Sequence, residues 1–210
     1  MEGMRIAQLL QPFTDDAELP PPLLEQLQVY LDLLLRWNAR INLTAVRHPE
    51  QVVTRHFGES LFAAGVLFGD RTANSGSLAD VGSGAGFPGI PIKLFEPELE
   101  LVLIESQSKK ATFLREVLRA LHLDGAEVFG GRAEEWGKTA DLVTLRAVEQ
   151  FERALPVAAK LVAPGGRLCL LIGSGQVSAA QGIIGDSWMC REAVAVPQST
   201  GRVVLIAERR

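Results

Sequence analysis

A dense run of glycines follows a short apolar strand in this 210-residue chain. Leu78 to Val81 form the strand and include the acidic Asp80, and the glycines that follow are Gly82, Gly84, Gly86 and Gly89. Glycines let the backbone turn sharply and let a ligand approach without meeting a Cβ atom. The N–H groups of the helix expected after Pro88 point into that turn. The segment therefore predicts a nucleotide-type cofactor site at the carboxyl end of the first strand of an α/β sheet.

Strands and helices alternate from Ser77 onward. We expect strands over 78–82, 101–104, 126–129, 141–145 and 167–172, helices over about 88–96, 107–121 and 148–162, and a short turn or helix over 133–137. Apolar strands separated by helices indicate a parallel sheet that is covered on both faces. Near the end, segments 194–196 and 202–207 flank a hairpin connection, which predicts an antiparallel edge.

The first part of the chain is helical in pattern. We expect a short helix within residues 1–19, an amphipathic helix from the prolines at 20–22 to about Asn38, and a second helix from Pro49 to about Phe68. Residues 69–76 are small and polar, which predicts a loop. We place a domain boundary there, with an N-terminal helical cap over 1–76 and a cofactor-binding domain over 77–210, packed as one compact unit.

Composition narrows the class of protein. With 47% hydrophobic residues the chain has enough apolar material for a globular core. Cys169 and Cys190 are too few for a disulfide framework and are expected to be reduced. We expect a cytoplasmic protein, because no targeting segment and no apolar run long enough to cross a membrane is visible. The net charge of −4 argues against a general nucleic-acid binder, although a local basic face is compatible with it.

Two cofactors compete for the glycine turn. Gly84 to Gly89 formally fits the dinucleotide fingerprint, and Glu105, at the end of the second strand, would bind ribose hydroxyls of either cofactor. Asp80 suits a ligand with an ammonium and a sulfonium better than a pyrophosphate. The turn at 164–166 and the terminal hairpin also resemble class I methyltransferases. We therefore favour S-adenosylmethionine and a Rossmann-like, mostly parallel seven-stranded sheet with a C-terminal antiparallel hairpin and an N-terminal helical extension. A dinucleotide oxidoreductase and a structural α/β domain remain alternatives, and so does a bracing role for Asp80.

Several motifs resemble one family. The run from Asp80 to Pro91, with Phe-Pro-Gly-Ile after the glycines, is similar to the motif of the bacterial 16S ribosomal RNA guanine-N7 methyltransferases, formerly called glucose-inhibited division protein B. Further matches, in order along the chain, are Trp37-Asn38 with Asn42-Leu43-Thr44, Arg55-His56-Phe57, Ser60-Leu61, Glu105-Ser106, Lys109-Lys110, Phe113-Leu114, Gly131 to Glu135 and Arg146-Ala147. One departure is Gly58-Glu59, where the family usually has a bulky residue and Asp.

The resemblance implies transfer of a methyl group from S-adenosylmethionine to N7 of one guanine in the decoding-region hairpin of small-subunit rRNA. By that similarity Gly82 and Phe87 contact the cofactor, the Ala133-Glu134 pair lies along the adenine, and Arg146 closes the site. The cofactor site that we predict comprises Asp80, Gly82, Ser83, Gly84, Gly86, Phe87, Glu105, Ser106, Ala133, Glu134 and Arg146. The residues that we expect to position the substrate are Arg146, Arg55, His56 and Asn42.

The residues present suit methylation at N7. The fourth predicted strand ends in Thr144-Leu145-Arg146-Ala147, which is neither the Asn/Asp-Pro-Pro-aromatic block of amine methylation nor a cysteine nucleophile. Guanine N7 carries an in-plane lone pair and needs no deprotonation. We therefore predict no general base and no metal, and expect catalysis by alignment of the reactants.

Two basic groups could meet RNA phosphates. Arg36, Arg40, Arg47 and Arg55 form one, and Lys109, Lys110, Arg115 and Arg119 form the other. Either group alone could be an ordinary solvated face. We expect a monomer whose substrate is 16S rRNA within a partly assembled small-subunit ribonucleoprotein. Two alternatives are a catalytically silent ribosome-associated S-adenosylmethionine-binding protein and a small-molecule methyltransferase.

Overall fold

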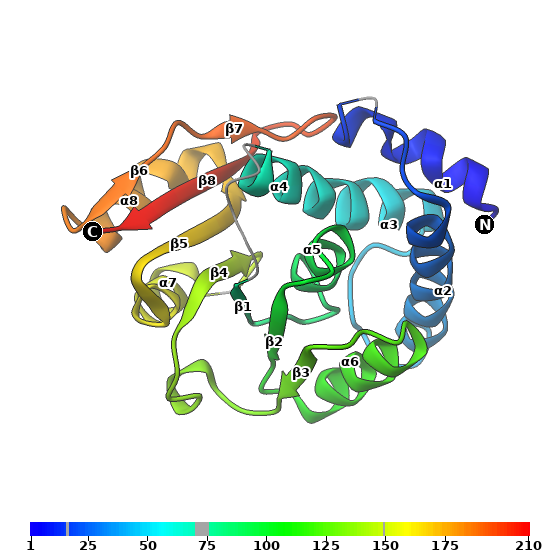
Figure 1. The fold of residues 1–210 in the computed structure, drawn as a ribbon, viewed down its shortest axis with the longest axis horizontal. Helices are drawn as coiled ribbons and strands as arrows, with labels where there is room; N and C mark the ends of the chain where they lie inside the picture. The colour runs from blue at the N-terminus through cyan, green and yellow to red at the C-terminus, as the bar shows by residue number, and fades with distance from the viewer. Residues whose placement is uncertain (16, 70–75, 149) are drawn as a thin grey trace.

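A central sheet runs through the molecule in the computed structural model, which describes residues 1–15, 17–69, 76–148 and 150–210. Five parallel strands are β1 (Ser77–Val81), β2 (Glu100–Ile104), β3 (Ala126–Phe129), β4 (Ala140–Arg146) and β5 (Val162–Gly173). The antiparallel end consists of β6 (Trp188–Cys190), β7 (Val194–Ala195) and β8 (Arg202–Arg209). The order is β3-β2-β1-β4-β5-β8-β6, with β7 also paired to β8 (Figure 1).

The sheet has seven strand positions, because β6 and β7 pair with successive parts of the same strand. Cys190 lies opposite Ala207, and Val194 lies opposite Val204. The predicted seven-stranded, mostly parallel sheet with an antiparallel end is therefore confirmed. β5 begins earlier than expected and includes the predicted turn at 164–166. The prediction also omitted β6 and the helix before it.

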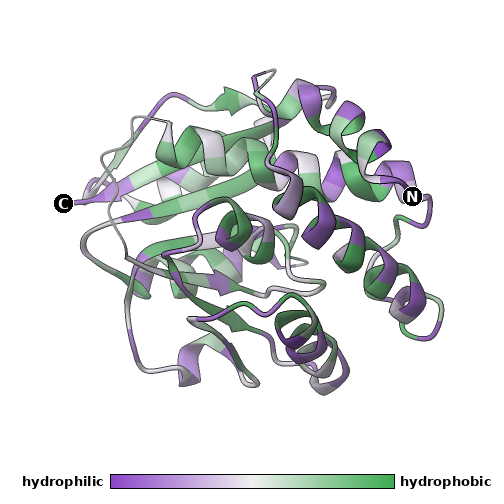
Figure 2. Ribbon diagram, turned by 45° about the vertical axis from the view of Figure 1, so that its right-hand side comes forward, coloured by the Kyte–Doolittle hydropathy of each residue, from purple (hydrophilic) through white to green (hydrophobic). Residues whose placement is uncertain are grey.

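Helices cover both faces of the sheet. One face carries α5 (Gly89–Phe95), α6 (Ser108–Ala120) and the N-terminal helices, and the other carries α7 (Phe151–Lys160) and α8 (Val177–Ile184). Short 3-10 turns are η3 (Ala133–Glu135) and η4 (Ser174–Gln176). Side chains alternate along each strand, so Leu78 points into the first core and Ala79 into the second. Hydrophobic residues lie along the strands and on the helices that cover them (Figure 2).

The N-terminal region comprises α1 (Gly3–Leu10), η1 (Gln11–Phe13), α2 (Pro21–Asn38), α3 (Pro49–Val52), η2 (Val53–Gly58) and α4 (Glu59–Phe68). The helix expected over 49–68 is interrupted by η2, which is π-helical. Gly58 permits this widened turn to pack closely, since a Cβ there would lie 2.7 Å from the ring of Phe13. Of the loop predicted over 69–76, residues 70–75 lie outside the described residues.

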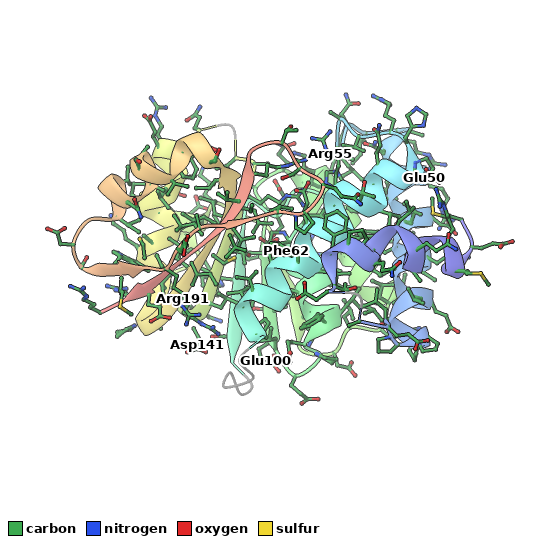
Figure 3. The ribbon with its side chains drawn as sticks, turned by 90° about the horizontal axis from the view of Figure 1, so that it is seen from above. Glu50, Arg55, Phe62, Glu100, Asp141 and Arg191 are labelled. Atoms are coloured by element: carbon green, nitrogen blue, oxygen red, sulfur yellow. The ribbon has the colours of Figure 1, made fainter. Side chains whose placement is uncertain are left out.

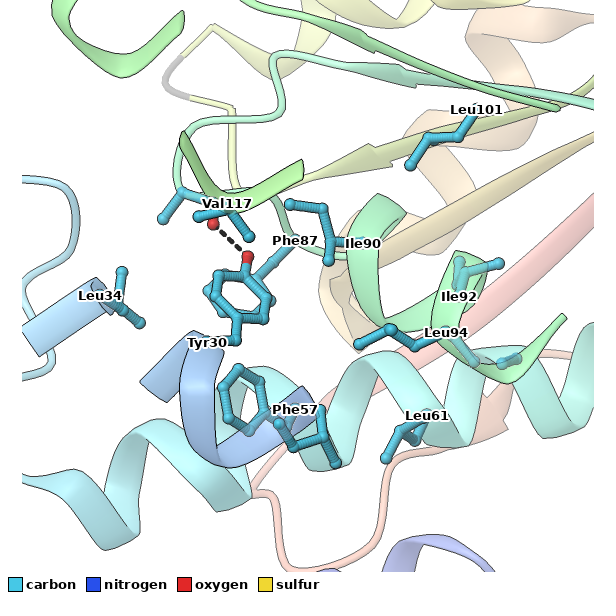
Figure 4. Packing of buried hydrophobic residues seen from close by; sticks show 14 of the residues in the cluster. Tyr30, Leu34, Phe57, Leu61, Phe87, Ile90, Ile92, Leu94, Leu101 and Val117 are labelled. Atoms are coloured by element: carbon cyan, nitrogen blue, oxygen red, sulfur yellow. Dashed lines mark hydrogen bonds between the residues drawn. The ribbon is translucent and has the colours of Figure 1, made fainter. Parts of the chain in front are cut away.

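The N-terminal helices share their hydrophobic core with the sheet. Tyr30 of α2, Phe57 of η2 and Leu61 of α4 belong to the same buried cluster as Ile90 of α5 and Leu101 of β2 (Figure 4). A boundary at residue 76 therefore separates two regions of sequence that share one core. Within the described residues, no helix has the length and apolarity needed to cross a membrane.

Candidate active site

The glycine turn after β1 needs glycine for two different reasons. Gly82 and Gly84 have φ values of +67° and +58°, a region that favours glycine, and both face an open cleft. A Cβ on Gly84 would meet no protein atom closer than 3.8 Å, so the space beside it is left for a ligand. Gly86 has φ +90°, but a Cβ there would lie 2.5 Å from Tyr30 Oη and from Ile90 Cδ1. At Gly86, which is predicted to bind the cofactor, the absence of a Cβ makes room for the core residues Tyr30 and Ile90.

Asp80 lies beneath the turn and does not line the cleft. Its Oδ1 accepts a hydrogen bond of 2.7 Å from Thr144 Oγ1, and its Oδ2 accepts one of 3.3 Å from the backbone N of Gly89. Only 1% of the residue is exposed, and burial raises the pKa of Asp80 to about 6. The carboxylate joins β1, β4 and α5, which is the bracing role that the sequence left open beside the predicted cofactor contact.

Glu105 borders the cleft at the end of β2. Its Oε2 accepts a hydrogen bond of 2.9 Å from Gly84 N, and its Oε1 accepts one of 2.7 Å from Gln107 N. The carboxylate is thereby fixed in orientation, and each oxygen keeps a second lone pair for a hydroxyl group. Ser83 and Ser106 also line the cleft, as predicted for cofactor contacts.

Three aromatic rings and an imidazole pack together behind the turn. Phe87 stacks on Tyr30 at 5.3 Å between ring centroids and on His56 at 4.8 Å, and Phe57 contacts both Tyr30 and Phe87. Tyr30 Oη donates a hydrogen bond to the backbone oxygen of Ala85, and burial raises the pKa of Tyr30 so that the donor keeps its proton. This aromatic cluster, Tyr30, His56, Phe57 and Phe87, connects α2 and η2 to the glycine turn.

His56 is held as a neutral imidazole. Burial and the nearby positive charge of Arg146 lower its pKa to about 3. Its Nδ1 faces Arg146 Nη2 at 3.3 Å, so this nitrogen is the acceptor. The proton therefore sits on Nε2, which donates to Thr44 Oγ1 at 2.8 Å. His56 thus acts as a spacer between the loop after α2 and the end of β4.

The loop after α2 is organised by Asn38. Asn38 Oδ1 accepts hydrogen bonds from the backbone N of Leu43 at 2.9 Å and of Thr44 at 3.0 Å. Asn42 is exposed, contacts Arg47 at 3.3 Å and does not line the cleft. The loop turns the side chain of Asn42 outward while Asn38 fixes the backbone, so a role of Asn42 in positioning the substrate stays a prediction.

Arg146, the last residue of β4, is locked into η2 and α4. Its Nη2 contacts Glu59 Oε2 at 2.8 Å and donates to the backbone oxygen of Arg55. The other oxygen of Glu59 contacts Arg202 Nη2, also at 2.8 Å. Glu59 is 3% exposed, and burial raises its pKa while the two arginines act against that rise. One buried carboxylate therefore holds two arginines from different strands.

A cleft of about 760 Å³ joins these parts. It opens at the carboxyl ends of the parallel strands, and Figure 3 places Arg55 at the opposite edge from Glu100 and Asp141, near the amino ends of β2 and β4. The lining includes Thr44, Arg55, His56, Gly82, Ser83, Gly84, Ala85, Phe87, Glu105, Ser106, Lys110, Arg146, Val148 and Arg202. The predicted Ala133 and Glu134 lie on η3, after β3, and do not line it.

The cleft has the chemistry of a site for a nucleoside with a charged tail. Glu105 offers acceptors for ribose hydroxyls at one end, open space lies beside Gly84, and Arg146 stands beyond it. A dinucleotide would place its pyrophosphate at the glycine turn, close to the carboxylates of Glu105 and Asp80. The residues present therefore fit S-adenosylmethionine better than a dinucleotide.

Comparison with known proteins identifies the family. A family model described as rRNA small subunit methyltransferase G matches residues 23–182, which include the glycine turn, Glu105 and Arg146. The chain belongs to this family.

Relatives in the methyltransferase G family support the match. Ribosomal RNA small subunit methyltransferase G of Xanthomonas campestris pv. campestris is 42% identical over 170 residues, covering 80% of this chain and 76% of that protein. The protein of the same name from Stenotrophomonas maltophilia is 44% identical over 160 residues, covering 75% and 71%. Residues beyond 182, including Arg202, lie outside the family match.

Solved structures support the fold at low sequence identity. Magnesium protoporphyrin IX methyltransferase from Synechocystis PCC 6803, solved with bound SAM, has a TM-score of 0.67 at 14% identity and covers 86% of this chain and 97% of that one. A ribosomal protein L11 methylase from Lactobacillus delbrueckii has a TM-score of 0.59 at 13% identity, covering 73% and 79%. The methyltransferase G chain therefore has a class I methyltransferase-like α/β fold.

Sequence reasoning missed several residues of this site. Tyr30 is buried on the helix that was expected to be amphipathic, and Arg202 lies on a strand that carries no motif. In the sequence Glu59 is marked only as a departure from the family pattern, without a partner. The available signal for Glu59 was an acid in an otherwise apolar helix, because a buried charge requires a partner. No local pattern marked Arg202, since its partner is far away in the sequence.

Proposed function

We propose that this chain transfers the methyl group of S-adenosylmethionine to N7 of one guanine in 16S rRNA. Membership of the rRNA small subunit methyltransferase G family is the observation that carries this conclusion, since the family match includes the cleft residues of β1, β2 and β4. The finer assignment, a guanine in the decoding-region hairpin, is also part of the proposal. It is supported by the resemblance of the motifs around Asn42, Arg55 and Phe87.

The residues of the cleft fit a reaction that needs no acid or base. S-adenosylmethionine, when bound, supplies a methyl group activated by its sulfonium. His56 is neutral, stacked on Phe87 and committed to Thr44, so it is not placed to take a proton from a substrate. Guanine N7 has its lone pair available. The contribution of the chain is alignment, which is worth roughly 7–11 kcal/mol in well-oriented reactions.

Each part of the cleft has a role in this proposal. Gly82, Ser83 and Gly84 form the cradle beside the cofactor, and Glu105 accepts hydrogen bonds from its ribose hydroxyls. Phe87 forms a wall whose position the aromatic cluster fixes. Arg146 closes the site toward the methionine end or the target guanine. Ala133 and Glu134 lie on η3, outside the cleft lining. In this proposal they contact the adenine of the cofactor from η3.

The RNA is proposed to approach over the N-terminal helical cap, residues 1–76, and α6. Arg55 and Lys110 line the cleft from these two regions, and Lys109, Arg115 and Arg119 continue the basic surface along α6. With a net charge of −4 the chain is not expected to bind free RNA tightly. We therefore propose that its substrate is 16S rRNA within a small-subunit ribonucleoprotein. We also propose that the chain acts as a monomer.

The function is tested in cells that lack the protein. 16S rRNA from a deletion strain, compared with rRNA from the same strain carrying the gene again, should lack one N7-methylguanine. Chemical cleavage at N7-methylguanine followed by primer extension locates the missing mark. Loss of a methyl group from another base, or no change in the 16S rRNA, contradicts the assignment.

The state of the substrate is tested separately. Purified protein should methylate 30S subunits from the deletion strain far faster than protein-free 16S rRNA from the same cells. Equal rates on both substrates would contradict the ribonucleoprotein part of the proposal while leaving the target base intact. Turnover in either case excludes a catalytically silent binding protein.

A further inference from the structure

We propose that Arg202 binds a backbone phosphate of the RNA beside the target guanine, and that Glu59 is the positioning residue that holds it there. This inference rests on the proposed function and adds a substrate contact from outside the family match. Arg202 is the first residue of β8 and pairs with Gly173, the last residue of β5. Its side chain therefore starts at the carboxyl edge, where the cleft opens.

The backbone at Arg202 is firmly held. Its carbonyl oxygen accepts a hydrogen bond of 2.9 Å from Val196 N, and the preceding Gly201 accepts one of 2.7 Å from Ser174 N. The guanidinium is then oriented by Glu59 through the contact at 2.8 Å. A side chain that is fixed at both ends loses little conformational freedom when it binds a ligand.

Arg202 has more guanidinium N–H donors left for a ligand than Arg146 has. Among the described residues, Arg146 Nη2 contacts Glu59, His56 and the backbone of Arg55. Arg202 contacts Glu59 through Nη2, and its guanidinium makes no other ion pair with the described residues. Its side chain is 34% exposed and lines the cleft. The planar fork of a guanidinium matches two phosphate oxygens.

The charge of this corner favours an anion. Among the residues that the structure describes, the cleft lining contains four basic side chains, those of Arg55, Lys110, Arg146 and Arg202, and one acidic side chain, that of Glu105. Glu59 neutralises only one of the arginines it contacts. The remaining positive charge lies at the mouth of the cleft, where an RNA strand presents phosphates.

The position in the sheet favours RNA over the carboxylate of the cofactor. The strand order places β4 and β5 between β1 and β8. The glycine turn follows β1, and three strand spacings separate β1 from β8. At about 4.7–4.9 Å for each spacing, the two strands lie roughly 14 Å apart. Arg202 therefore lies on the side of the cleft away from Glu105, beyond Arg146, where the substrate has to enter.

The test compares Arg202→Gln with Arg191→Gln. Arg191 contacts Glu208 at 2.6 Å on the surface, near the other end of β8, so its replacement changes the net charge equally without touching the cleft. The substrate is 30S subunits that lack the methyl mark, with KM and kcat measured over a range of salt concentrations. The affinity for S-adenosylmethionine is measured by calorimetry, and thermal unfolding reports whether each variant is folded.

Arg202→Gln should raise KM for the subunits about tenfold, as expected for a lost charge-assisted hydrogen bond. It should also reduce the slope of log(kcat/KM) against log salt by about one unit. The affinity for S-adenosylmethionine and the behaviour of Arg191→Gln should match the parent. If Arg202→Gln unfolds, Arg202→Lys serves instead and should retain the parent salt slope with a higher KM.

Two results would overturn the proposal. The first is that Arg202→Gln leaves both KM and the salt slope unchanged. If only Arg202→Lys folds, the corresponding result is an unchanged KM in that variant. The other is weaker binding of S-adenosylmethionine with an unchanged KM for subunits, which would assign Arg202 to the cofactor. Failure of the parent protein to methylate subunits would overturn the proposed function and this inference together. An active parent with an unaffected variant overturns this inference alone.

Discussion

The hydroxyl group of Tyr30 on α2 donates a hydrogen bond to the backbone oxygen of Ala85 in the glycine turn. The ring of Tyr30 stacks on Phe87 in the same turn. Tyr30 therefore joins α2 to the glycine turn by one hydrogen bond and one ring contact, and His56 and Phe57 of η2 add two further ring contacts with Phe87. This connection explains why Gly86 has no space for a Cβ, since the tyrosine hydroxyl occupies it.

Tyr30→Phe should separate the hydrogen bond from the ring contact. The phenylalanine ring keeps the stacking, but the Ala85 carbonyl is left buried without its donor, at a cost of about 1–3 kcal/mol in the free energy of unfolding. Urea unfolding measures the loss, and calorimetry should show weaker binding of S-adenosylmethionine. A Tyr30→Phe protein as stable as the parent would show that the hydrogen bond contributes nothing to the fold.

Glu59→Gln should destabilise the fold strongly. The substitution keeps the shape of the side chain but leaves Arg146 and Arg202 without their shared anion, and breaking a buried ion pair typically costs about 3–5 kcal/mol. Glu208→Gln is the matched control, because it removes the partner of Arg191 at the surface and should cost less than about 1 kcal/mol. Equal losses of unfolding free energy in the two variants would contradict the buried role of Glu59.

His56 makes the stability of the parent fall in acid. The folded-state pKa of about 3 lies below the ordinary value of 6.5, so between these values the unfolded chain binds a proton that the folded chain does not. Unfolding is therefore favoured as pH falls through 6.5, by up to about 2 kcal/mol at pH 5. His56→Gln should remove this part of the pH dependence.

The measurement is the difference in unfolding free energy between pH 7.5 and pH 5 for the parent and for His56→Gln. Taking the difference cancels any loss of packing that the substitution causes at both pH values. The variant should lose less stability than the parent over this interval. An identical loss would mean that His56 is not buried as a neutral imidazole.

Asp80→Asn tests the bracing role of the acid beneath the turn. The amide can accept a hydrogen bond from Gly89 N and donate one to Thr144 Oγ1, so the brace is retained while the charge is removed. The dissociation constant for S-adenosylmethionine should rise by less than about tenfold. A direct contact between the carboxylate and a ligand ammonium would be worth about 1.5–3 kcal/mol, so its loss would weaken binding tenfold or more.

The sheet and the cofactor turn were predictable because their signals are local. Alternating apolar strands and helices mark 77–172, and Gly82, Gly84 and Glu105 stand at strand ends, where sequence alone indicates a ligand site. α8 and β6 were missed because they are short, with eight and three residues, and a segment of that length shows no clear apolar period.

Orientation and long-range pairing were not predictable. The sequence places Asp80 and Gly86 in the motif, but only their packing against Thr144 and Tyr30 shows which way they face. The meeting of Glu59 with Arg202 depends on β8 lying beside β5, a pairing between distant parts of the chain. Sequence periodicity does not contain that information.

The most direct test uses the purified chain, S-adenosylmethionine carrying a labelled methyl group, and 30S subunits that lack the mark. The position of the label is mapped by cleavage at N7-methylguanine and primer extension along the 16S rRNA. We expect a single labelled site, at N7 of one guanine in the decoding-region hairpin. Label on a ribosomal protein, on another atom of the RNA, or on no component of the subunit would contradict it.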